Sequence, residues 1–411
     1  MGQKTKTKQS FDAIISGGGM IGLPLAIGLS RCGMKVAVID AATPKTQLDK
    51  TFDGRSSAIA YASYLMLDAI GLWQHAAKFA QPINDIHVSD AGTFVFVHFE
   101  TGDHDHNPMG FMVENRHIRL SLEECLKETK GVTRFAPNKI KTHKKSAGGV
   151  SVTLEDGPAL SAPLLIAAEG RFSSLRKSAG IGVTNWSYKQ SGIVATIEHE
   201  HPHLGIAHEL FFGDGPFAIL PLQGNRSSLV WALKDDYADL VKDFSDAAFE
   251  REISERVGGF LGKVKVTGPR WVFPLSLQMP DSIIGERLVL TGDAAHGIHP
   301  IAGQGLNLGF RDIAALIEVL NSAKSKGEDL GGVQVLERYE RWRRTDNLVL
   351  ATVTDGLTKL FSNDLKAVKA ARTFGLGVVQ KTPKAKKFFV DHARGTFGKL
   401  PVLLKGELPR N

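Results

Sequence analysis

Residues 288–309 read LVLTGDAAHGIHPIAGQGLNLG, which combines a short apolar strand, a glycine-rich loop and the start of a helix. The apolar run ends in Gly292 and Asp293, so a carboxylate stands at the carboxyl end of the predicted strand. Ligands bind at that end of the strands in open α/β sheets. The loop carries Gly303 and Gly305, and we expect its backbone N–H groups to approach a flat or anionic ligand at the helix N-terminus. For this segment alone, the alternative is an ordinary strand–loop–helix connection.

A second glycine-rich turn lies near the start of the chain. An apolar strand at 11–16 runs into Gly17, Gly19 and Gly22, which have the spacing G-x-G-x-x-G, and a helix and a second strand follow before Asp40. The glycines allow a tight turn that places a pyrophosphate on the helix N-terminus, and an acid about 20 residues further on can bind a ribose hydroxyl. In this order of elements the motif predicts a dinucleotide site. It does not separate FAD from NAD.

The composition indicates a globular chain of about two domains. Of its 411 residues, 43% are hydrophobic and 23% are charged. No apolar run approaches the ~20 residues that a transmembrane helix needs, and we expect no signal peptide. Only Cys32 and Cys125 are present, which fits a reducing cytoplasm and excludes a disulfide framework.

The net charge of +7 is concentrated toward the C-terminus, where lysines and arginines outnumber acidic residues after Asp364. A basic, partly amphipathic end favours contact with anionic lipid or an acidic partner. A solvated helical face is the alternative. Because no recognition motif accompanies the charge, nucleic acid is not an expected partner.

An inserted, mainly β region is predicted from 191 to 273. Its histidine-rich segment at 198–208 fits no regular zinc spacing, and His296 and His299 share a loop rather than a helix face, so no metal ligand is predicted. The predicted elements are strands at 193–198, 207–212, 217–222 and 227–233 and a helix at 246–257.

Three fingerprints together resemble those of the FAD-dependent aromatic hydroxylases, the class A flavoprotein monooxygenases with the p-hydroxybenzoate hydroxylase fold. The N-terminal glycine motif matches the first, and the segment from Gly292 to Asn307 matches the third closely. Residues 168–176 match the second, an Asp-Gly motif, except that Glu169 stands where the family has Asp. The longer side chain bears on a contact that is thought to serve both FAD and NAD(P)H in the family.

Within this family the chain is most similar to the ubiquinone-biosynthesis hydroxylases, over nearly its whole length. The segments that carry this similarity are 53–58, 113–116, 215–222, 311–312, 354–363, 372–376 and 393–395. The resemblance implies an α/β fold, with a Rossmann-like FAD/NAD(P)-binding domain, an inserted mainly β substrate domain and C-terminal helices. The expected boundaries are 10–80, 110–185 and 280–330 for the discontinuous FAD-binding domain, 81–109 and 186–279 for the substrate-binding β domain, and 331–411 for the C-terminal helical region.

The resemblance also assigns site residues. Asp293 would bind the ribityl or pyrophosphate part of FAD, Asp40 the adenosine ribose and Arg116 the phosphates, while Arg55 would add positive charge near the pyrophosphate. A cap or a simple ion pair is the alternative for Arg55. No catalytic acid or base is named. The expected cofactor-binding residues are Gly17, Gly19, Gly22, Asp40, Arg55, Arg116, Glu169, Gly292, Asp293, Pro300, Gly303, Gly305, Leu306 and Asn307, of which the last four would lie against the isoalloxazine edge.

The implied reaction is hydroxylation of the aromatic ring of a polyprenylated phenol in ubiquinone biosynthesis. NAD(P)H would reduce FAD, and the reduced flavin would form a C4a-hydroperoxide with O₂ that attacks the ring. The expected surroundings are the cytoplasm and the inner-membrane surface, with a quinone-biosynthesis complex as a further partner. The alternatives are a hydroxylase of a soluble aromatic, a FAD-dependent prenyl reductase, and a non-catalytic flavin-binding member of a quinone-synthesis complex, to which Glu169 gives weight.

Overall fold

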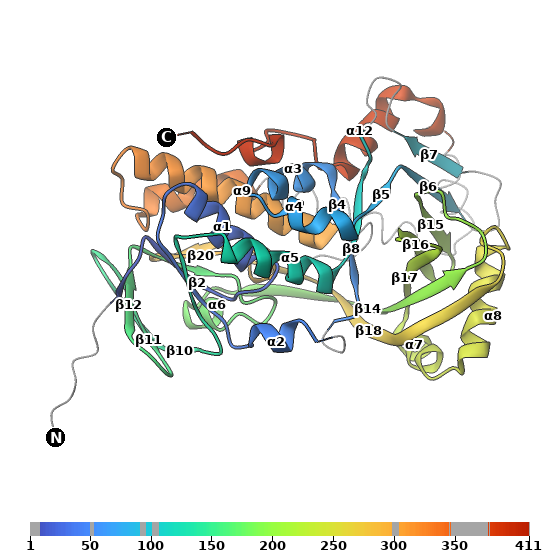
Figure 1. Cartoon of the computed structure of the whole chain (residues 1–411), viewed down its shortest axis with the longest axis horizontal. Helices are drawn as coiled ribbons and strands as arrows, with labels where there is room; N and C mark the ends of the chain where they lie inside the picture. Colours follow the sequence, from blue (N-terminus) through green and yellow to red (C-terminus); the bar gives the residue numbers. More distant parts are fainter. Residues whose placement is uncertain are drawn as a thin grey trace.

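Two sheet-based regions lie side by side in the molecule (Figure 1). The computed structural model describes residues 9–49, 53–90, 96–100, 107–297, 304–344, 346, 377 and 379–410.

A six-stranded sheet forms the centre of the first region. Its strand order is β19-β20-β13-β2-β3-β9, and every neighbouring pair is parallel except β19 with β20. β2, β3, β13 and β20 are apolar and buried along their whole length, as expected for parallel strands that helices cover on both faces. The strands are β2 (Ala13–Ser16), β3 (Val36–Ile39), β9 (Val132–Phe135), β13 (Leu164–Ala167), β19 (Ile284–Gly285) and β20 (Leu288–Leu290).

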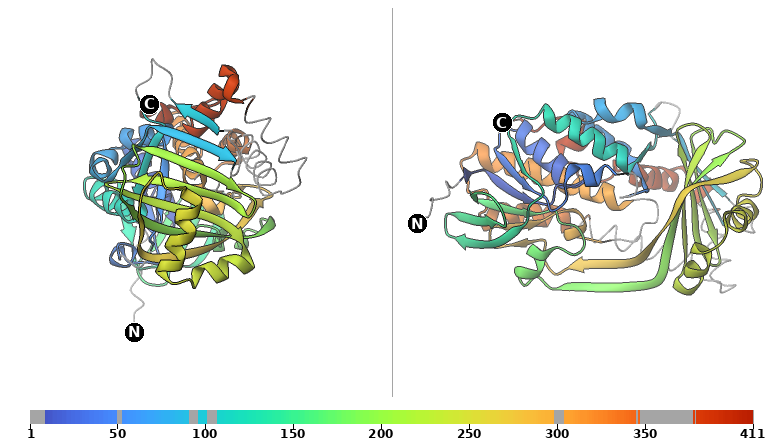
Figure 2. Two further views of the ribbon diagram at one scale, coloured as in Figure 1. Left: turned by 90° about the vertical axis from the view of Figure 1, so that its right-hand side faces the viewer. Right: turned by 60° about the horizontal axis from the view of Figure 1, so that its bottom comes forward.

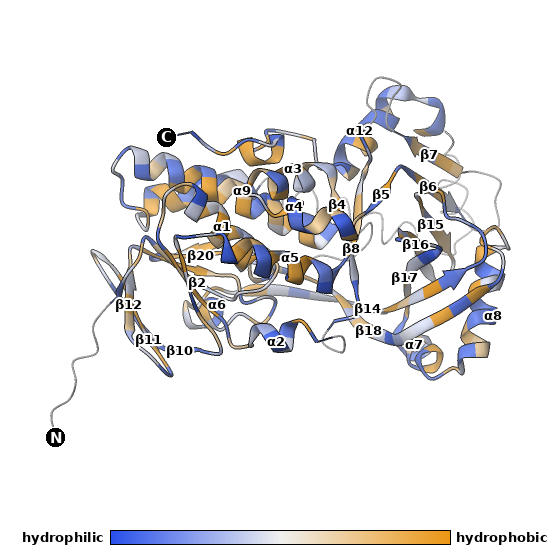
Figure 3. Cartoon of the chain, in the orientation of Figure 1, coloured by the Kyte–Doolittle hydropathy of each residue, from blue (hydrophilic) through white to orange (hydrophobic). Residues whose placement is uncertain are grey.

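Three helices pack together in this region: α1 (Gly22–Arg31), α5 (Asn115–Lys127) and α9 (Gln304–Ser325). α9 buries Phe310, Ile313, Ile317 and Leu320 completely, and their spacing places all four on one helical face. Figure 3 shows the hydrophobic colouring concentrated on α9 and on the nearby strands. The helix at 333–344 packs its buried Tyr339 against the sheet, where the hydroxyl donates to the Leu290 carbonyl at 3.1 Å.

Two smaller sheets complete the first region, with strand orders β1-β12-β11-β10 and β4-β8-β5. Their strands are β1 (Gln9–Ser10), β4 (Ser56–Ala60), β5 (Gln81–Ile83), β8 (Gly110–Glu114), β10 (Ile140–Ser146), β11 (Gly149–Leu154) and β12 (Ala159–Ala162). The short helices of this region are α2 (Pro44–Gln47), α3 (Tyr61–Ala69), α4 (Trp73–Ala76), η1 (Ala77–Phe79), α6 (Ser174–Ser178), η2 (Gly292–Ala294) and η4 (Val402–Lys405).

The second region is a seven-stranded sheet of order β18-β14-β17-β16-β15-β6-β7, antiparallel except between β15 and β6. One face packs on α7 and α8 around Phe217, Trp231 and Phe249. The long strands β14 and β18 run from this sheet to the first region (Figure 2, right). α12 (Pro383–Ala393) contacts β7. The other elements are β6 (Asp85–Asp90), β7 (Phe96–Glu100), β14 (Val183–His199), β15 (Ile206–Phe212), β16 (Gly215–Leu222), β17 (Arg226–Lys234), α7 (Asp235–Lys242), α8 (Asp246–Val257) and β18 (Val264–Pro280).

Most predicted elements of the inserted sheet are present, but the strand β14 begins earlier in the chain than predicted. The predicted helix at 246–257 coincides with α8, and the strands predicted within 207–233 coincide with β15, β16 and β17. The strand predicted at 193–198 is too short, because β14 begins at Val183. The first half of β14 is largely polar and exposed, so it shows no hydrophobic alternation, and pairing with β18 makes it a strand. The sequence also predicts a helix at 364–379, which falls mostly outside the described residues.

Candidate active site

The N-terminal glycine turn presses against the end of β13. Gly17 has φ +105°, and a Cβ added there would lie 2.2 Å from the carbonyl oxygen of Ala168, so only glycine fits. A Cβ added at Gly19 would meet no atom within 4 Å, and Gly19 lines a cavity. Bare backbone therefore faces this cavity at the start of α1, which is the arrangement that binds a pyrophosphate.

Asp40 follows β3 and joins the same cavity wall. Its Oδ2 accepts hydrogen bonds from the Gly18 amide at 2.9 Å and from Gln47 Nε2 at 2.8 Å, while its Oδ1 accepts from the Ala42 amide at 2.9 Å. The carboxylate thus lies where the motif predicts a ribose-binding acid, and it also holds the glycine turn in place. The contact with Gln47 has no signal in the sequence.

Arg55 is held in the cavity wall by the buried Asp53. Arg55 donates to both carboxylate oxygens, at 2.8 and 3.0 Å, and Arg119 and Asn115 donate to Asp53 Oδ2 at 2.8 and 3.0 Å. Burial alone would raise the pKa of Asp53, but the hydrogen bonds from Arg55 and Arg119 outweigh it and hold that pKa far below its usual value. The Arg55 guanidinium also lies 4.6 Å from the ring centroid of Phe273 on β18. Both regions therefore fix this positive charge.

The segments around residues 20 and 300 meet at Ile21. A Cβ added at Gly292 would lie 2.9 Å from Ile21 Cγ1, and one added at Gly309 would lie 2.4 Å from Ile21 Cδ1. The glycines of the β20 loop and of α9 thereby let the N-terminal turn approach closely. Asp293 is exposed, lines the cavity, and acts electrostatically on Arg55. The two glycine-rich segments thus share one cavity, as the sequence predicts.

A buried ion network fixes the loop from behind. Asp312 on α9 accepts from the Gly292 amide at 2.9 Å and from Arg343 Nε at 2.7 Å, and its Oδ2 lies 2.6 Å from His296 Nε2. Burial would raise the pKa of Asp312, but the charges of His296 and Arg343 outweigh it, so the pKa is lowered. Arg343 also donates to Asp346 at 2.6 Å. In the sequence, Asp312 stands out only in the family resemblance, and Arg343 only as one of several arginines at 338–344.

Glu169 connects β2 to the start of α6. Its Oε1 accepts from Ser16 and Ser174 at 2.9 and 3.0 Å, and its Oε2 accepts from the Ser173 hydroxyl at 2.6 Å and the Leu175 amide at 3.0 Å. The carboxylate also lines the cavity. Its four hydrogen-bond donors lie on β2 and at the start of α6, and the glutamate side chain, one methylene longer than aspartate, reaches both.

Glu169→Asp is therefore expected to lower the free energy of unfolding by about 1–3 kcal/mol, because a carboxylate shortened by one methylene leaves part of its donor set unpaired. Urea unfolding measures the change. Glu155→Asp, at an exposed glutamate beside β11, is the matched control and is expected to change stability by less than about 0.5 kcal/mol. Unchanged stability of Glu169→Asp together with faster NAD(P)H-driven flavin reduction would contradict this structural role.

The start of α9 supplies the last group of predicted site residues. Gly305, Leu306 and Asn307 line the cavity. Asn307 accepts from the Ala60 amide at 2.9 Å and donates to the Ala58 carbonyl at 2.8 Å, so its side chain ties α9 to β4. Pro300 and Gly303 lie outside the described residues.

Arg116 is set apart from the other predicted residues. It is half-buried, its Nε donates to the Leu48 carbonyl at 2.9 Å, and it is absent from the described lining of the cavity. Its assignment to the phosphates stays a prediction.

The cavity is a single space of about 1490 Å³ that extends from the glycine turn to the second sheet. Ordinary small-molecule sites measure about 300–1,000 Å³, so a cofactor and a second molecule fit together. The polar groups that line the cavity match FAD: backbone amides at a helix N-terminus, the carboxylate of Asp40 after β3, the fixed guanidinium of Arg55 and the exposed carboxylate of Asp293 after β20.

Comparison with known proteins agrees with this geometry. The sequence profile of the family described as "FAD binding domain" matches residues 10–349. The chain is 44% identical over 385 residues to the ubiquinone hydroxylase UbiL of Rhodospirillum rubrum, covering 94% of this chain and 90% of that protein. It is 34% identical to the 3-demethoxyubiquinol 3-hydroxylase of Escherichia coli, covering 95% and 100%. The chain belongs to the FAD-dependent ubiquinone hydroxylases.

The fold of this hydroxylase is also that of solved flavin monooxygenases. The p-nitrophenol 4-monooxygenase PnpA of Pseudomonas putida matches it with a TM-score of 0.78 at 19% identity, covering 95% of this chain and 100% of that one. The predicted α/β fold of the p-hydroxybenzoate hydroxylase type is therefore confirmed.

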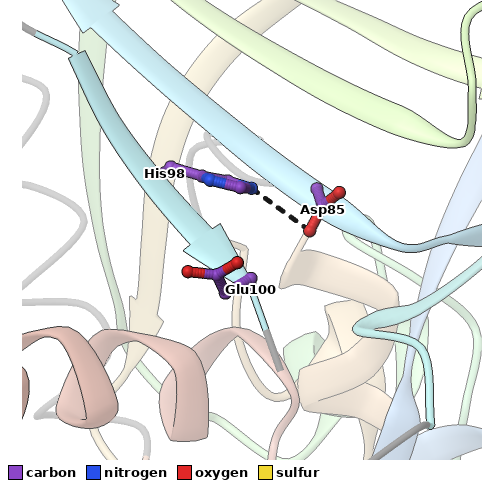
Figure 4. A group of neighbouring side chains, drawn as sticks. All are labelled: Asp85, His98 and Glu100. Atoms are coloured by element: carbon purple, nitrogen blue, oxygen red, sulfur yellow. Dashed lines mark ion pairs between the residues drawn. The ribbon is translucent and has the colours of Figure 1, made fainter. Parts of the chain in front are cut away.

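The outer strands of the hydroxylase carry one group of potential metal ligands among the residues that the structure describes. Asp85, His98 and Glu100 place ligand atoms within 4.8 Å of one another on β6 and β7 (Figure 4). His98 Nε2 lies 3.2 Å from Asp85 Oδ1, and Lys386 Nζ lies 3.4 Å from Glu100 Oε1. Lys386 already supplies the positive charge that a cation would bring, so we interpret Asp85, His98 and Glu100 as part of a network of ion pairs.

Proposed function

We propose that this hydroxylase inserts one oxygen atom from O₂ into the aromatic ring of a polyprenylated phenol, with NAD(P)H as reductant. The observation that carries the proposal is a single cavity. It continues from the wall formed by Gly19, Asp40, Arg55 and Asp293 to the largely apolar face of the seven-stranded sheet. The names of the relatives support the substrate class.

Different residues of the first region would bind different parts of FAD. Asp40 would hold the adenosine ribose, the turn at Gly17 and Gly19 the pyrophosphate, and Asp293 the ribityl chain, with Arg55 balancing the phosphate charge. Bound FAD supplies the activation of O₂, which no side chain can perform. The protein orients the ring beside it and keeps water away.

The second region suits a ring with a long apolar tail. The cavity wall there includes Val88, Phe99 and Leu220 from the sheet and Phe388 and Phe389 from α12. The ring would lie near the start of α9, and the tail would extend along the sheet toward α12.

Oxygen insertion is the direct test. The FAD-loaded protein is mixed with a short-chain prenylphenol, NAD(P)H and ¹⁸O₂, and the product is examined by mass spectrometry. We expect one labelled oxygen atom in the ring. A yellow protein whose flavin NAD(P)H does not reduce, and that labels no prenylphenol, would instead support a non-catalytic flavin-binding role. Equal turnover of phenols without a tail would support a soluble aromatic substrate.

We further propose that α12 rests on an anionic membrane surface. Lys384 and Lys387 are exposed on this helix, Lys381 is exposed just before it, and the side chain of Phe388, at the cavity wall, is 41% exposed. Among the described helices, none combines the length and the apolar character needed to cross a bilayer. A surface contact at α12 would admit a prenyl tail directly from the lipid.

Replacing Lys381, Lys384 and Lys387 by glutamine is expected to weaken binding to anionic vesicles about tenfold or more, since each basic residue near such a surface contributes about 1 kcal/mol. Vesicle sedimentation measures this. The same replacement at the exposed Lys130, Lys141 and Lys144 is the control and should change binding less. Lys141 and Lys144 lie on β10, which Figure 1 shows at the other end of the molecule from α12. Equal binding by both triple variants would exclude α12 as the contact.

A further inference from the structure

Glu209 on β15 is a carboxylate within a row of aliphatic residues on the cavity wall, which His208 of the same strand also lines. Cross-strand pairing aligns it with Val88 on β6 and Ala218 on β16, and continues the row to Val230 on β17 and Val194 on β14. Directly paired residues of neighbouring strands present their side chains on the same face of a sheet. All five line the cavity, and four of them are aliphatic.

Alternation along β15 separates this face from the opposite one. Leu210 and Phe212 pack on the core formed with α7 and α8, whereas Ala207, Glu209 and Phe211 line the cavity. Glu209 has no hydrogen bond or ion pair with any residue that the structure describes. Glu209 is half-buried in the cavity wall, and a carboxylate held among apolar neighbours without a partner is costly unless a ligand pairs with it.

Ala207, two residues before Glu209 on β15, links this strand to the elements at the start of α9. Ala207 belongs to a packed cluster that Ala58 of β4 also contacts, and the Ala58 carbonyl accepts from Asn307 at the start of α9. Two residues along a strand span roughly 7 Å. Glu209 therefore lies on the same cavity wall, two residues along β15 from this cluster.

We propose that Glu209 is the catalytic residue that accepts the proton of the substrate's phenolic hydroxyl. This inference rests on the proposed function and specifies how the cavity recognises its substrate. The phenol O–H bond breaks, the proton passes to a Glu209 carboxylate oxygen, and the electron pair stays on the phenolate oxygen, from which it enriches the ring. The ring then takes one oxygen atom of O₂, the other leaves as water with electrons from NAD(P)H, and Glu209 returns the proton to the product.

The protonation state of Glu209 suits this role. Burial raises its pKa to about 7 and is the sole cause of the shift. The titratable groups on the neighbouring elements include His208 on the same strand, Asp85, His87 and Asp90 on β6, Arg226 and Lys234 on β17, and Lys384, Lys386, Lys387, Asp391 and His392 on α12. None of them shifts this pKa. A proton acceptor with a pKa near the working pH is partly ionised and still basic enough to take a proton.

Ligand binding tests recognition without turnover. A one-isoprene phenol and its methyl ether are titrated into the FAD-loaded full chain and followed by calorimetry. Well above the pKa of about 7, the wild type is expected to bind the phenol about tenfold to a hundredfold tighter than the ether, because a hydrogen bond to a charged group is strong. The preference should fall when Glu209 is protonated, and likewise in Glu209→Gln, whose neutral amide oxygen accepts only a weaker hydrogen bond from the phenol.

Turnover tests the proton transfer. Glu209→Gln is isosteric and removes a charge from an apolar wall, so it should fold. Its kcat is expected to fall about a hundredfold or more, a loss separate from the rise in KM that its weaker binding of the phenol produces. Glu209→Asp should recover part of kcat. Glu198→Gln, at an exposed glutamate on β14 of the same sheet, is the control.

The results separate the two proposals. Equal affinity of the wild type for phenol and ether, or unchanged kcat in Glu209→Gln, would overturn the role of Glu209 while hydroxylation by the wild type stands. A clear, Glu209-dependent preference for the phenol without any oxygen insertion would leave recognition by Glu209 intact and refute the proposed function.

Discussion

Asp312→Ala is expected to lower the free energy of unfolding by about 3–5 kcal/mol, because it leaves the guanidinium of Arg343 buried without its main counter-charge. Arg343 is 1% exposed, and water cannot replace the lost carboxylate. The change also removes the acceptor of the Gly292 amide and the partner of His296, so the loop that presents Asp293 loses its support. We therefore expect the variant to retain little FAD. Urea unfolding and the ratio of flavin to protein absorbance measure the two effects.

A surface ion pair provides the control for Asp312. Glu328 pairs with Arg338, and both side chains are 35% exposed. Glu328→Gln is expected to cost less than about 1 kcal/mol and to leave FAD content unchanged. If Asp312→Ala were no more destabilising than Glu328→Gln, the buried network would not be what holds the loop.

Gly17→Ala and Gly19→Ala are expected to fail in different ways, although they lie two residues apart. At Gly17 the added methyl group meets the Ala168 carbonyl at 2.2 Å and φ is +105°, and backbone strain and overpacking each cost about 1–3 kcal/mol. Gly17→Ala should therefore lose both stability and FAD. At Gly19 the methyl group meets no protein atom within 4 Å, so stability should change by less than about 0.5 kcal/mol.

Gly19→Ala is expected to lower the affinity for FAD. Its methyl group projects into the space assigned to the pyrophosphate, and overpacking of about 1–3 kcal/mol corresponds to a loss of roughly tenfold to a hundredfold. Reconstitution of the apoprotein with FAD, followed by flavin fluorescence, measures this. Gly148→Ala, in the turn between β10 and β11, is the control, since its methyl group also meets no protein atom within 4 Å. Wild-type affinity in Gly19→Ala would place the pyrophosphate elsewhere.

Local sequence motifs were enough to predict which residues form the cavity wall at the glycine turn. Gly17 and Asp40 sit in one strand–turn–helix–strand unit whose spacing is fixed by the unit itself, so the motif predicts where they lie. The same holds for Asp293, which directly follows a strand. Asn307 shows the limit of this reasoning: its cavity position agrees with the motif, but its side chain bonds to β4, which is 249 residues away in the chain.

The sequence by itself determined the fold class, the family and several carboxylates and glycines that line the cavity, because each depends on patterns within about 30 residues. Only the tertiary structure decided which groups support them. Asp312 meets Arg343 through the packing of two helices, and Glu209 faces the cavity through the register of five strands. Neither relation leaves a local pattern, since a buried charge is stabilised by neighbours that the chain brings together only when it folds.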